Sequence, residues 1–527
     1  MSIQRWMPRR DLSKKEELLC KHLKRVRTLL VFLREWRHEI FDDAFQRKLS
    51  SMYRDTGAGK EPITPALMAV ATLVQDYLAV SDAELVKLTV FDETVRMVLD
   101  HFEQDAPAFS QGAFSDFRQR FIRADMDRAL LERTIEIAKR SKGFDWRKLP
   151  KTLRVGIDSV PLEGAGRVED TFNLLGHAAR NVVRCAAQLL KWTEKRVCEQ
   201  AGIPLLLEPS IKAGLDIDWT DPEQKDDAIK RLARQLDSLQ SWLATRLAEE
   251  IAKPPLKEHV ATLAQIRSQN LEPDPGGGGI RIREGVAEDR RISVEDPDMR
   301  HGRKSTLKLF NGYKQHVAAA IDFDLILACA VLPANRPEGE GATPLKADIE
   351  RQGLSISEAL FDRAYASAPI VEEVIAAGGT IICKPWVARN GKLFVKTAFN
   401  INLRDRTITC PSGLQTLRFE LGQRVKFSPK KCDGCPVRSL CTEAKLGIGR
   451  TIHIADNEPL QKKLRKLQQT NAGRARLRER VAIEHRLAHV TRRQARRARY
   501  LGARKNLFAL RRAAVVHNLQ VLQRKQA

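Results

Sequence analysis

Three acidic residues stand where their carboxylates could act together on metal ions. Asp158 and Asp362 each come directly after a short segment with the alternation of a β-strand. Carboxylates at the ends of neighbouring strands suit hard divalent cations, which prefer oxygen ligands. A third acid has to come from later in the chain, where Glu484 is the best placed and Glu479 is its competitor. Taken singly, each acid has the alternative of being a surface or capping residue.

Four cysteines form a second cluster with chemical potential. Cys432 and Cys435 are separated by two residues, Cys441 follows, and Cys410 lies upstream in a Cys-Pro-Ser-Gly sequence. Thiolates at this spacing fit one tetrahedral zinc ion. The alternatives are reduced cysteines in a loop and, less favoured, a redox pair, because the motif does not open a helix after a strand. The sequence therefore predicts a structural zinc site here.

The elements that carry the two aspartates predict an α/β core with a mixed sheet. Residues 153–157 form a strand that delivers Asp158 at its end, where Ser159 and Pro161 break it. Further strands are expected at residues 312–317, 325–332, 357–361 and 380–383. Helical patterns lie before, between and after these strands.

The changes of pattern along the 527 residues divide the chain into several parts. We expect a helical N-terminal domain at residues 1–145, a catalytic core at 146–400 and 456–527, a helical insertion at about 176–295, and a cysteine-rich, zinc-binding insertion at 401–455. Within the first part, a helix that starts at Ser110 could present Arg118 and Arg120 on its surface as candidates to bind DNA, with a solvated basic face as the alternative.

The charge of the chain favours a polyanionic partner. Lys and Arg number 91 against 66 Asp and Glu, which gives a net charge of +25, and the arginines concentrate after residue 461. Nucleic acid is the leading partner, because cations set against phosphates release counterions. Anionic lipid and a merely basic surface stay open as alternatives. The N-terminus lacks the apolar stretch of a secretory signal and no apolar run approaches a membrane span, so we expect a cytoplasmic protein without a membrane partner.

Several motifs, in order along most of the chain, resemble the DDE transposases of bacterial insertion sequences. Their residues are 158–166 (DSVPLEGAG) and 169–175 (EDTFNLL) for the first aspartate, 300–305, 310–314 and 332–335 for the strands that follow, 362–365 (DRAY) for the second aspartate, 480–484 for the glutamate, and 516–519 (VHNL) for the closing helix. Residues 81–85 and 114–118 resemble the helical DNA-binding domain that precedes this core in many such elements.

The resemblance implies a ribonuclease H-like fold in which Asp158, Asp362 and Glu484 bind two Mg²⁺ or Mn²⁺ ions. One ion would activate a water or a DNA 3′-hydroxyl, and the other would stabilise the leaving oxygen. Arg480 would position a phosphate.

The further DNA-binding residues implied by the resemblance are Lys314, Arg492 and Arg493. Where members of the wider group often have Tyr and Lys around the glutamate, this chain has Leu477 and Thr491, and Arg492 is the candidate to replace the lysine, although Arg and Lys are not equivalent at phosphates.

As a member of this family, the chain would bind the terminal inverted repeats of its element, cleave them, and join the 3′-OH ends to target DNA. Pairing two element ends implies at least a homodimer on DNA, acting at the bacterial nucleoid. Three alternatives stay open: a zinc-containing binding module, an inactive transposase-derived DNA-binding protein, and a metal-dependent nuclease without strand transfer.

Overall fold

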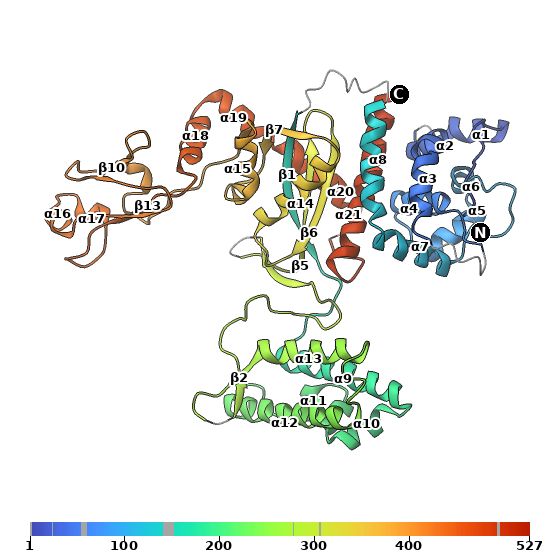
Figure 1. Cartoon of the computed structure of the whole chain (residues 1–527), viewed down its shortest axis with the longest axis horizontal. Coiled ribbons are helices and arrows are strands. Elements are labelled where there is room, and N and C mark those ends of the chain that lie inside the picture. The colour runs from blue at the N-terminus through green and yellow to red at the C-terminus, as the bar shows by residue number, and fades with distance from the viewer. Residues whose placement is uncertain are drawn as a thin grey trace.

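The protein, seen in a computed structural model, is built around one sheet with helices packed against it. The structure describes residues 3–23, 25–53, 61–140, 152–277, 279–304, 307–492 and 496–526. In Figure 1 the N-terminal helices lie on one side of the sheet, a small arm rich in short strands projects from the opposite side, and a helical lobe hangs from a third.

The N-terminal part consists of helices with clear capping residues. They are α1 (Lys14–Leu23), α2 (Thr28–Ile40), α3 (Asp43–Ser50), α4 (Pro65–Leu78), α5 (Asp82–Phe91), α6 (Glu93–Leu99), α7 (Gln111–Arg123) and α8 (Met126–Arg140). The Oγ of Ser81 accepts from the backbone N–H of Glu84 at 3.1 Å, and that of Ser110 accepts from Ala113 at 3.1 Å. The predicted helix start at Ser110 is confirmed, and Ser81 caps α5 in the same way, since these bonds satisfy amides that the helix itself leaves free.

In the described ranges, no single helix has both the length and the apolar composition to cross a membrane. Helices α4 and α5 pass that test only as a pair, and they are bent by 104° from one another.

The central sheet is mixed and has six strands in the order β4-β5-β1-β7-β8, with β6 also paired to β5. The strands are β1 (Thr152–Glu163), β4 (Arg300–Arg303), β5 (Leu309–Ala320), β6 (Leu325–Pro333), β7 (Ser355–Leu360) and β8 (Thr380–Ile382). Strand β5 runs antiparallel to β1, β4 and β6, whereas β1, β7 and β8 are parallel. The prediction of an α/β core with a mixed sheet is confirmed at this level.

Strand β1 is longer than the sequence predicts. It was expected to break at Ser159 and Pro161, but it continues to Glu163 and pairs with β5 over this whole stretch. Its pairing with β7 ends at Gly156. Proline lacks a donor and is tolerated in a strand where one edge has no partner. Asp158 therefore lies within β1, yet just beyond the end of its parallel neighbour.

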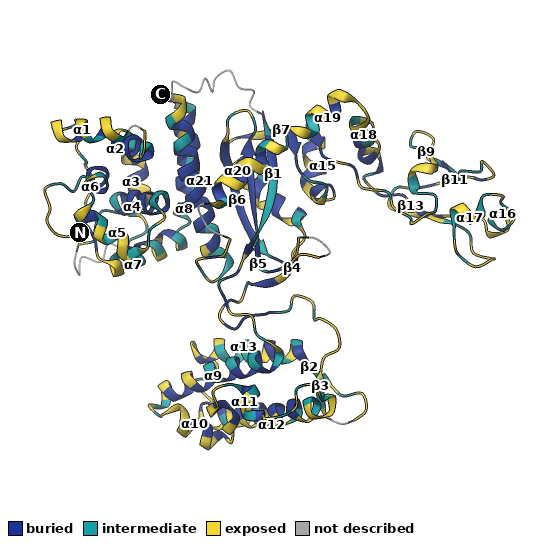
Figure 2. Ribbon diagram, turned by 180° about the vertical axis from the view of Figure 1, so that it is seen from behind, coloured by how far each residue is buried: buried dark blue, intermediate teal, exposed yellow. Residues whose placement is uncertain are grey.

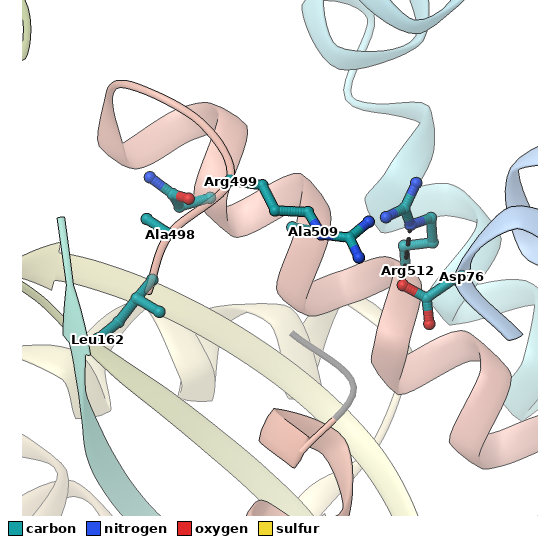
Figure 3. A pocket seen from close by; sticks show the side chains of 7 residues that line it. Asp76, Leu162, Ala498, Arg499, Ala509 and Arg512 are labelled. Carbon is teal, nitrogen blue, oxygen red and sulfur yellow. Dashed lines mark hydrogen bonds and ion pairs between the residues drawn. The ribbon is translucent and has the colours of Figure 1, made fainter. Parts of the chain in front are cut away.

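The C-terminal helix ties the sheet to the N-terminal helices. Buried side chains of both parts form one continuous core, and α21 (Ala503–Gln526) packs against α4, α8 and β6. Figure 3 shows Arg512 of α21 pointing to Asp76 of α4; their Nε and Oδ1 atoms are 3.1 Å apart and both side chains are almost fully buried. The small cavity drawn there, about 10 Å³, has room for a water molecule at most.

The remaining helices of the core cover the sheet and lead toward the arm. They are the 3₁₀ helices η3 (Glu338–Gly341) and η4 (Arg363–Tyr365) and the α-helices α14 (Ala342–Arg351), α15 (Pro369–Ala376), α18 (Glu458–Gln469), α19 (Asn471–Arg478) and α20 (Val481–Arg492).

The helical lobe has its own core, separate from that of the sheet. It is made of α9 (Thr171–Leu190), α10 (Glu194–Ala201), η2 (Pro204–Leu207), α11 (Ile211–Leu215), α12 (Pro222–Arg246), α13 (Leu256–Asn270) and the short hairpin β2 (Leu271–Pro273) and β3 (Ile280–Ile282). Figure 2 shows the dark, buried faces of its helices turned toward one another. It begins at Thr171, slightly before the predicted boundary near residue 176.

We call residues 400–453 the Cys arm. It holds the short strands β9 (Asn400–Asn402), β10 (Thr407–Thr409), β11 (Thr416–Arg418), β12 (Arg424–Lys426) and β13 (Thr451–His453) with the helical turns α16 (Pro429–Asp433) and α17 (Arg438–Cys441); η5 (Lys396–Ala398) leads into it. Its core is small, with seven buried hydrophobic side chains between Phe399 and Ile454.

Candidate functional site

Asp158 and Asp362 lie side by side at the centre of the sheet. Gly156 of β1 pairs with Leu360 of β7 in parallel register; Asp158 stands two residues further along β1, and Asp362 two residues beyond the end of β7. Neighbouring strands are roughly 4.8 Å apart. Asp362 caps η4, where its Oδ1 accepts the backbone N–H of Arg363 at 2.6 Å. The paired strands and the turn into η4 thus set the spacing of the two carboxylates.

Glu484 reaches the same place from helix α20, which crosses β1. The crossing is tight because β1 has a glycine there: a Cβ added to Gly156 would lie 3.1 Å from the Cβ of Ile483. Ile483 is fully buried, whereas the side chain of Glu484, the next residue, is 45% exposed. Because Ile483 packs on the sheet, the carboxylate of the next residue, Glu484, lies on the solvent-exposed side of the two aspartates.

The electrostatics of Asp158 show that the three acids share one environment. The pKa of Asp158 is raised to about 6, chiefly by burial and also by the negative charges of Glu484 and Asp362. A hydrogen bond from the backbone of Ser159 and the charge of Arg480 act in the opposite direction. Like charges held together in this way disfavour ionisation unless a cation joins them.

Arg480 is the cation that the structure places among these acids. Its Nη1 lies 3.5 Å from Oδ1 of Asp158, and it also pairs with Glu484. In the described part of the chain, no group of three or more His, Cys, Asp or Glu side chains is already arranged to hold a metal ion. Arg480 pairs with two of the three acids. The carboxylates are therefore near one another but do not converge on a common point.

Glu479, the competing third acid, is engaged elsewhere. It pairs with Arg154 of β1 and lies 3.7 Å from Arg476. Both arginines also pair with the buried Glu358 of β7. This network joins α19 to the start of β1, four residues before Asp158, which gives Glu479 a structural role.

Two of the arginines predicted to bind DNA contact other side chains of the N-terminal part. Arg118 makes a bidentate ion pair with Asp82, at 2.8 and 2.6 Å, and only 13% of its side chain is exposed. This corrects the expectation that Arg118 lies on the surface for DNA. Arg120 is exposed and stacks over the ring of Tyr53, 5.0 Å from its centroid.

The other predicted DNA-binding residues differ in their surroundings. Lys314 is half-buried and donates to the backbone oxygen of Arg336 at 2.7 Å, and burial lowers its pKa. Arg492 is exposed at the end of α20. Arg493 lies outside the described residues.

The four cysteines of the predicted zinc site line one cavity of about 20 Å³ in the Cys arm. Gln415 donates to two of them: its backbone N–H to Cys410 Sγ at 3.3 Å and its Nε2 to Cys432 Sγ at 3.5 Å. Burial raises the pKa of Cys410, but hydrogen bonds from Ser412 and from the backbone around it outweigh burial and lower it. The pKa of Cys441 is raised by burial and by the charges of the other three cysteines.

The sequence did not single out a buried polar group behind the aspartates. The hydroxyl of Tyr365 lies 2.7 Å from Nδ1 of His316 and also hydrogen-bonds Ser159, the residue after Asp158. Burial lowers the pKa of His316 to about 3, so the ring is neutral. Tyr365 lies within the Asp-Arg-Ala-Tyr motif, which was a signal, whereas nothing in the local sequence marks His316.

Fold and site together are those of an α/β protein with acidic residues near the centre of its mixed sheet. Residues 410–523 match the family model described as "Transposase DDE domain". The match includes the four cysteines and Glu484 and leaves both aspartates outside. The resemblance to the DDE transposases is confirmed by it. No curated protein and no solved structure matches the chain.

Proposed function

We propose that this protein is a DNA transposase that cleaves the ends of its element with Asp158, Asp362 and Glu484 and joins the freed 3′-OH ends to target DNA. Two observations support the proposal: the parallel register of β1 with β7, which brings Asp158 and Asp362 close together, and the negative charges of Glu484 and Asp362, which contribute to the raised pKa of Asp158. The transposase match over the segment that contains Glu484 supports it independently.

The core supports a ribonuclease H-like fold. Strands β6, β5 and β1 are antiparallel and are followed by the parallel β7 and β8, with helices covering the sheet. In this arrangement the two strands that carry aspartates are neighbours at its centre, where their side chains can act on one substrate.

The acids fit a pair of Mg²⁺ or Mn²⁺ ions, because they repel each other and offer only oxygen ligands. Bound there, such ions would supply the Lewis acidity that activates an attacking oxygen and stabilises a leaving one. Arg480 lies within reach of the same place and would hold a DNA phosphate once it gives up its contact with Asp158.

The test is metal-dependent cleavage of a labelled duplex that carries the presumed element end. Asp158→Asn, Asp362→Asn and Glu484→Gln should each lower the rate roughly a thousandfold or more, because they remove charge from the reacting centre while keeping its shape. All three variants should still bind the duplex, which a mobility-shift assay would show.

Glu479→Gln is the matched control, since the same change is made five residues away on the same segment. It should cut at nearly the wild-type rate and lose stability through its partners Arg154 and Arg476. Normal cutting by Glu484→Gln would refute the proposed third acid. A wild-type protein that binds but never cuts with Mg²⁺ or Mn²⁺ would instead favour the inactive, DNA-binding alternative.

A nuclease without strand transfer would share this site. The two functions separate when a duplex with a pre-cut 3′-OH end is offered together with a circular target. Joined products would support the transposase, whereas cleavage without any joining would support the nuclease.

A structural zinc ion at Cys410, Cys432, Cys435 and Cys441 belongs to the same proposal. The four thiols line one cavity, and the charges of the other three contribute to the raised pKa of Cys441, as expected where thiolates need a cation. Hydrogen bonds to the sulfur atoms, like those from Gln415, orient and stabilise thiolate ligands.

Elemental analysis of protein purified without chelators tests this site. We expect about one zinc per chain, and its loss in Cys432→Ser/Cys435→Ser. The control is Cys185→Ala/Cys198→Ala, two buried cysteines of the helical lobe, which should keep the metal. A wild-type protein free of zinc would exclude the site.

A further inference from the structure

The positive charge of this protein is unevenly divided among its parts. The helices from residue 14 to residue 140 contain 21 Lys and Arg against 21 Asp and Glu, and the helical lobe, residues 171–282, contains 15 against 15. The Cys arm contains ten against four. The arm is therefore strongly basic, whereas the two largest helical parts of the chain are neutral.

Most cations of the arm have no ion-pair partner among the described residues, in contrast to those of the N-terminal helices. Eight of the ten are exposed: Arg404, Arg406, Arg418, Arg424, Lys426, Lys430, Lys431 and Lys445. Among the described residues, the arm has a single ion pair, between Arg438 and Asp433 at 3.3 Å, and it uses none of these eight. No ion pair within the described part of the chain compensates their charge.

Four of these cations follow one another on one ribbon of the arm. Arg424 and Lys426 alternate with the buried Val425 on β12, so both point away from the arm's core. Lys430 and Lys431 follow in the first turn of α16, and the segment 421–432 contains no acid. The positive charges in such a row repel one another unless a polyanion lies against them.

We infer that the Cys arm is a second DNA-contacting surface, in which Arg424, Lys426, Lys430 and Lys431 bind backbone phosphates of duplex DNA. The inference rests on the proposed function for the identity of the polyanion. Cations two residues apart on a strand are about 6.8 Å apart, close to two phosphate steps of one DNA strand along the helix axis. In Figure 1 the arm projects well away from the sheet, so it would engage DNA beyond the segment that is cut.

The experiment is the salt dependence of binding to a labelled 60-base-pair duplex, measured by fluorescence anisotropy. The variant is Arg424→Gln/Lys426→Gln/Lys430→Gln/Lys431→Gln. Each lost phosphate contact should lower the slope of log K against log salt by about 0.9, so a fall of roughly 2–4 and at least a tenfold weaker binding near 0.1 M salt are expected. The thiols of the arm should react with a chromogenic disulfide as in the wild type, which shows that the arm is folded.

A matched control removes four exposed cations of the helical lobe, Arg231, Arg234, Lys253 and Lys257, by the same change to Gln. It should keep the wild-type slope. The inference is overturned if the folded arm variant keeps the wild-type slope, or if the control loses as much, because then only net charge matters. Cleavage of the same duplex at saturating protein separates this outcome from a failure of the proposed function. An arm variant that binds DNA normally and still cuts it would refute the inference about the Cys arm and leave the proposed function standing.

Discussion

At the scale of single residues, an arginine can serve DNA or the fold, and its partners decide which. Arg118 is held by both oxygens of Asp82 and is largely buried. Arg118→Gln should therefore destabilise the protein by about 1–3 kcal/mol, because it leaves a carboxylate without its charged partner. The salt slope of DNA binding should not change. Chemical denaturation and anisotropy measure the two effects, and a lower slope with unchanged stability would restore Arg118 to the DNA surface.

The buried pair of Glu16 and Arg34 predicts how stability depends on pH. Burial alone would raise the pKa of Glu16, but hydrogen bonds from Arg34 and from Ser13 outweigh it and lower the pKa to about 2. Because the folded pKa lies below the ordinary value of 4.5, the pair contributes stability above pH 4.5 and loses it as the pH falls toward 2. Glu16→Gln should cost about 2 kcal/mol at pH 7.

Urea denaturation at several pH values checks this. The difference between wild type and Glu16→Gln should shrink steadily from pH 4.5 to pH 2. The neighbouring Glu17 is exposed, so Glu17→Gln should show a small difference at every pH. A Glu16→Gln effect that stays constant with pH would mean that packing, and not charge, is lost.

At the scale of elements, the position of Glu484 depends on how closely α20 approaches β1. A Cβ at Gly156 would press on Ile483 at 3.1 Å, so Gly156→Ala should displace α20 by a few tenths of an ångström and Gly156→Val by more. Because small displacements of reacting groups are costly, we expect cleavage to fall about tenfold for Ala and about a hundredfold for Val. DNA binding should change little.

The control for this prediction is Gly112→Ala. Gly112 lies in α7, where an added Cβ would meet only Ser110 Oγ, at 4.0 Å, and alanine should stabilise the helix by up to ~1 kcal/mol. Cleavage should stay at the wild-type level. If Gly156→Val cut as fast as the wild type, the contact with Ile483 would not set the position of Glu484.

The elements also show what sequence could and could not predict. Alternation and capping residues predict the strands and helix starts, because these depend on neighbours in the chain. The full length of β1 could not be predicted, since Pro161 is tolerated only where β7 has ended. Nor could sequence alone separate Glu479 from Glu484: Arg154, which pairs with Glu479, and Glu358, which pairs with the same arginine, belong to strands more than a hundred residues away.

At the scale of the whole molecule, the described residues form three hydrophobic cores of very different size. One joins the N-terminal helices to the sheet, a second fills the helical lobe, and the third, in the Cys arm, has only seven buried hydrophobic side chains. A core of that size cannot offset the entropy of ordering a segment of this length, so small units of this kind need a metal or another cross-link. We therefore expect the arm to fold only when the proposed zinc ion is bound.

Removal of the metal should consequently unfold the arm and leave the rest intact. After treatment with a strong chelator, limited proteolysis should cut first within residues 400–453, while the sheet and the lobe resist as before. Adding Zn²⁺ back should restore resistance, because binding and folding are one equilibrium in such a unit. If the arm resists protease equally well after metal analysis shows that the zinc has gone, its seven-residue core is sufficient by itself. The DNA affinity that we assign to the arm should fall and return with the metal, since its cations align only on folded β12 and α16.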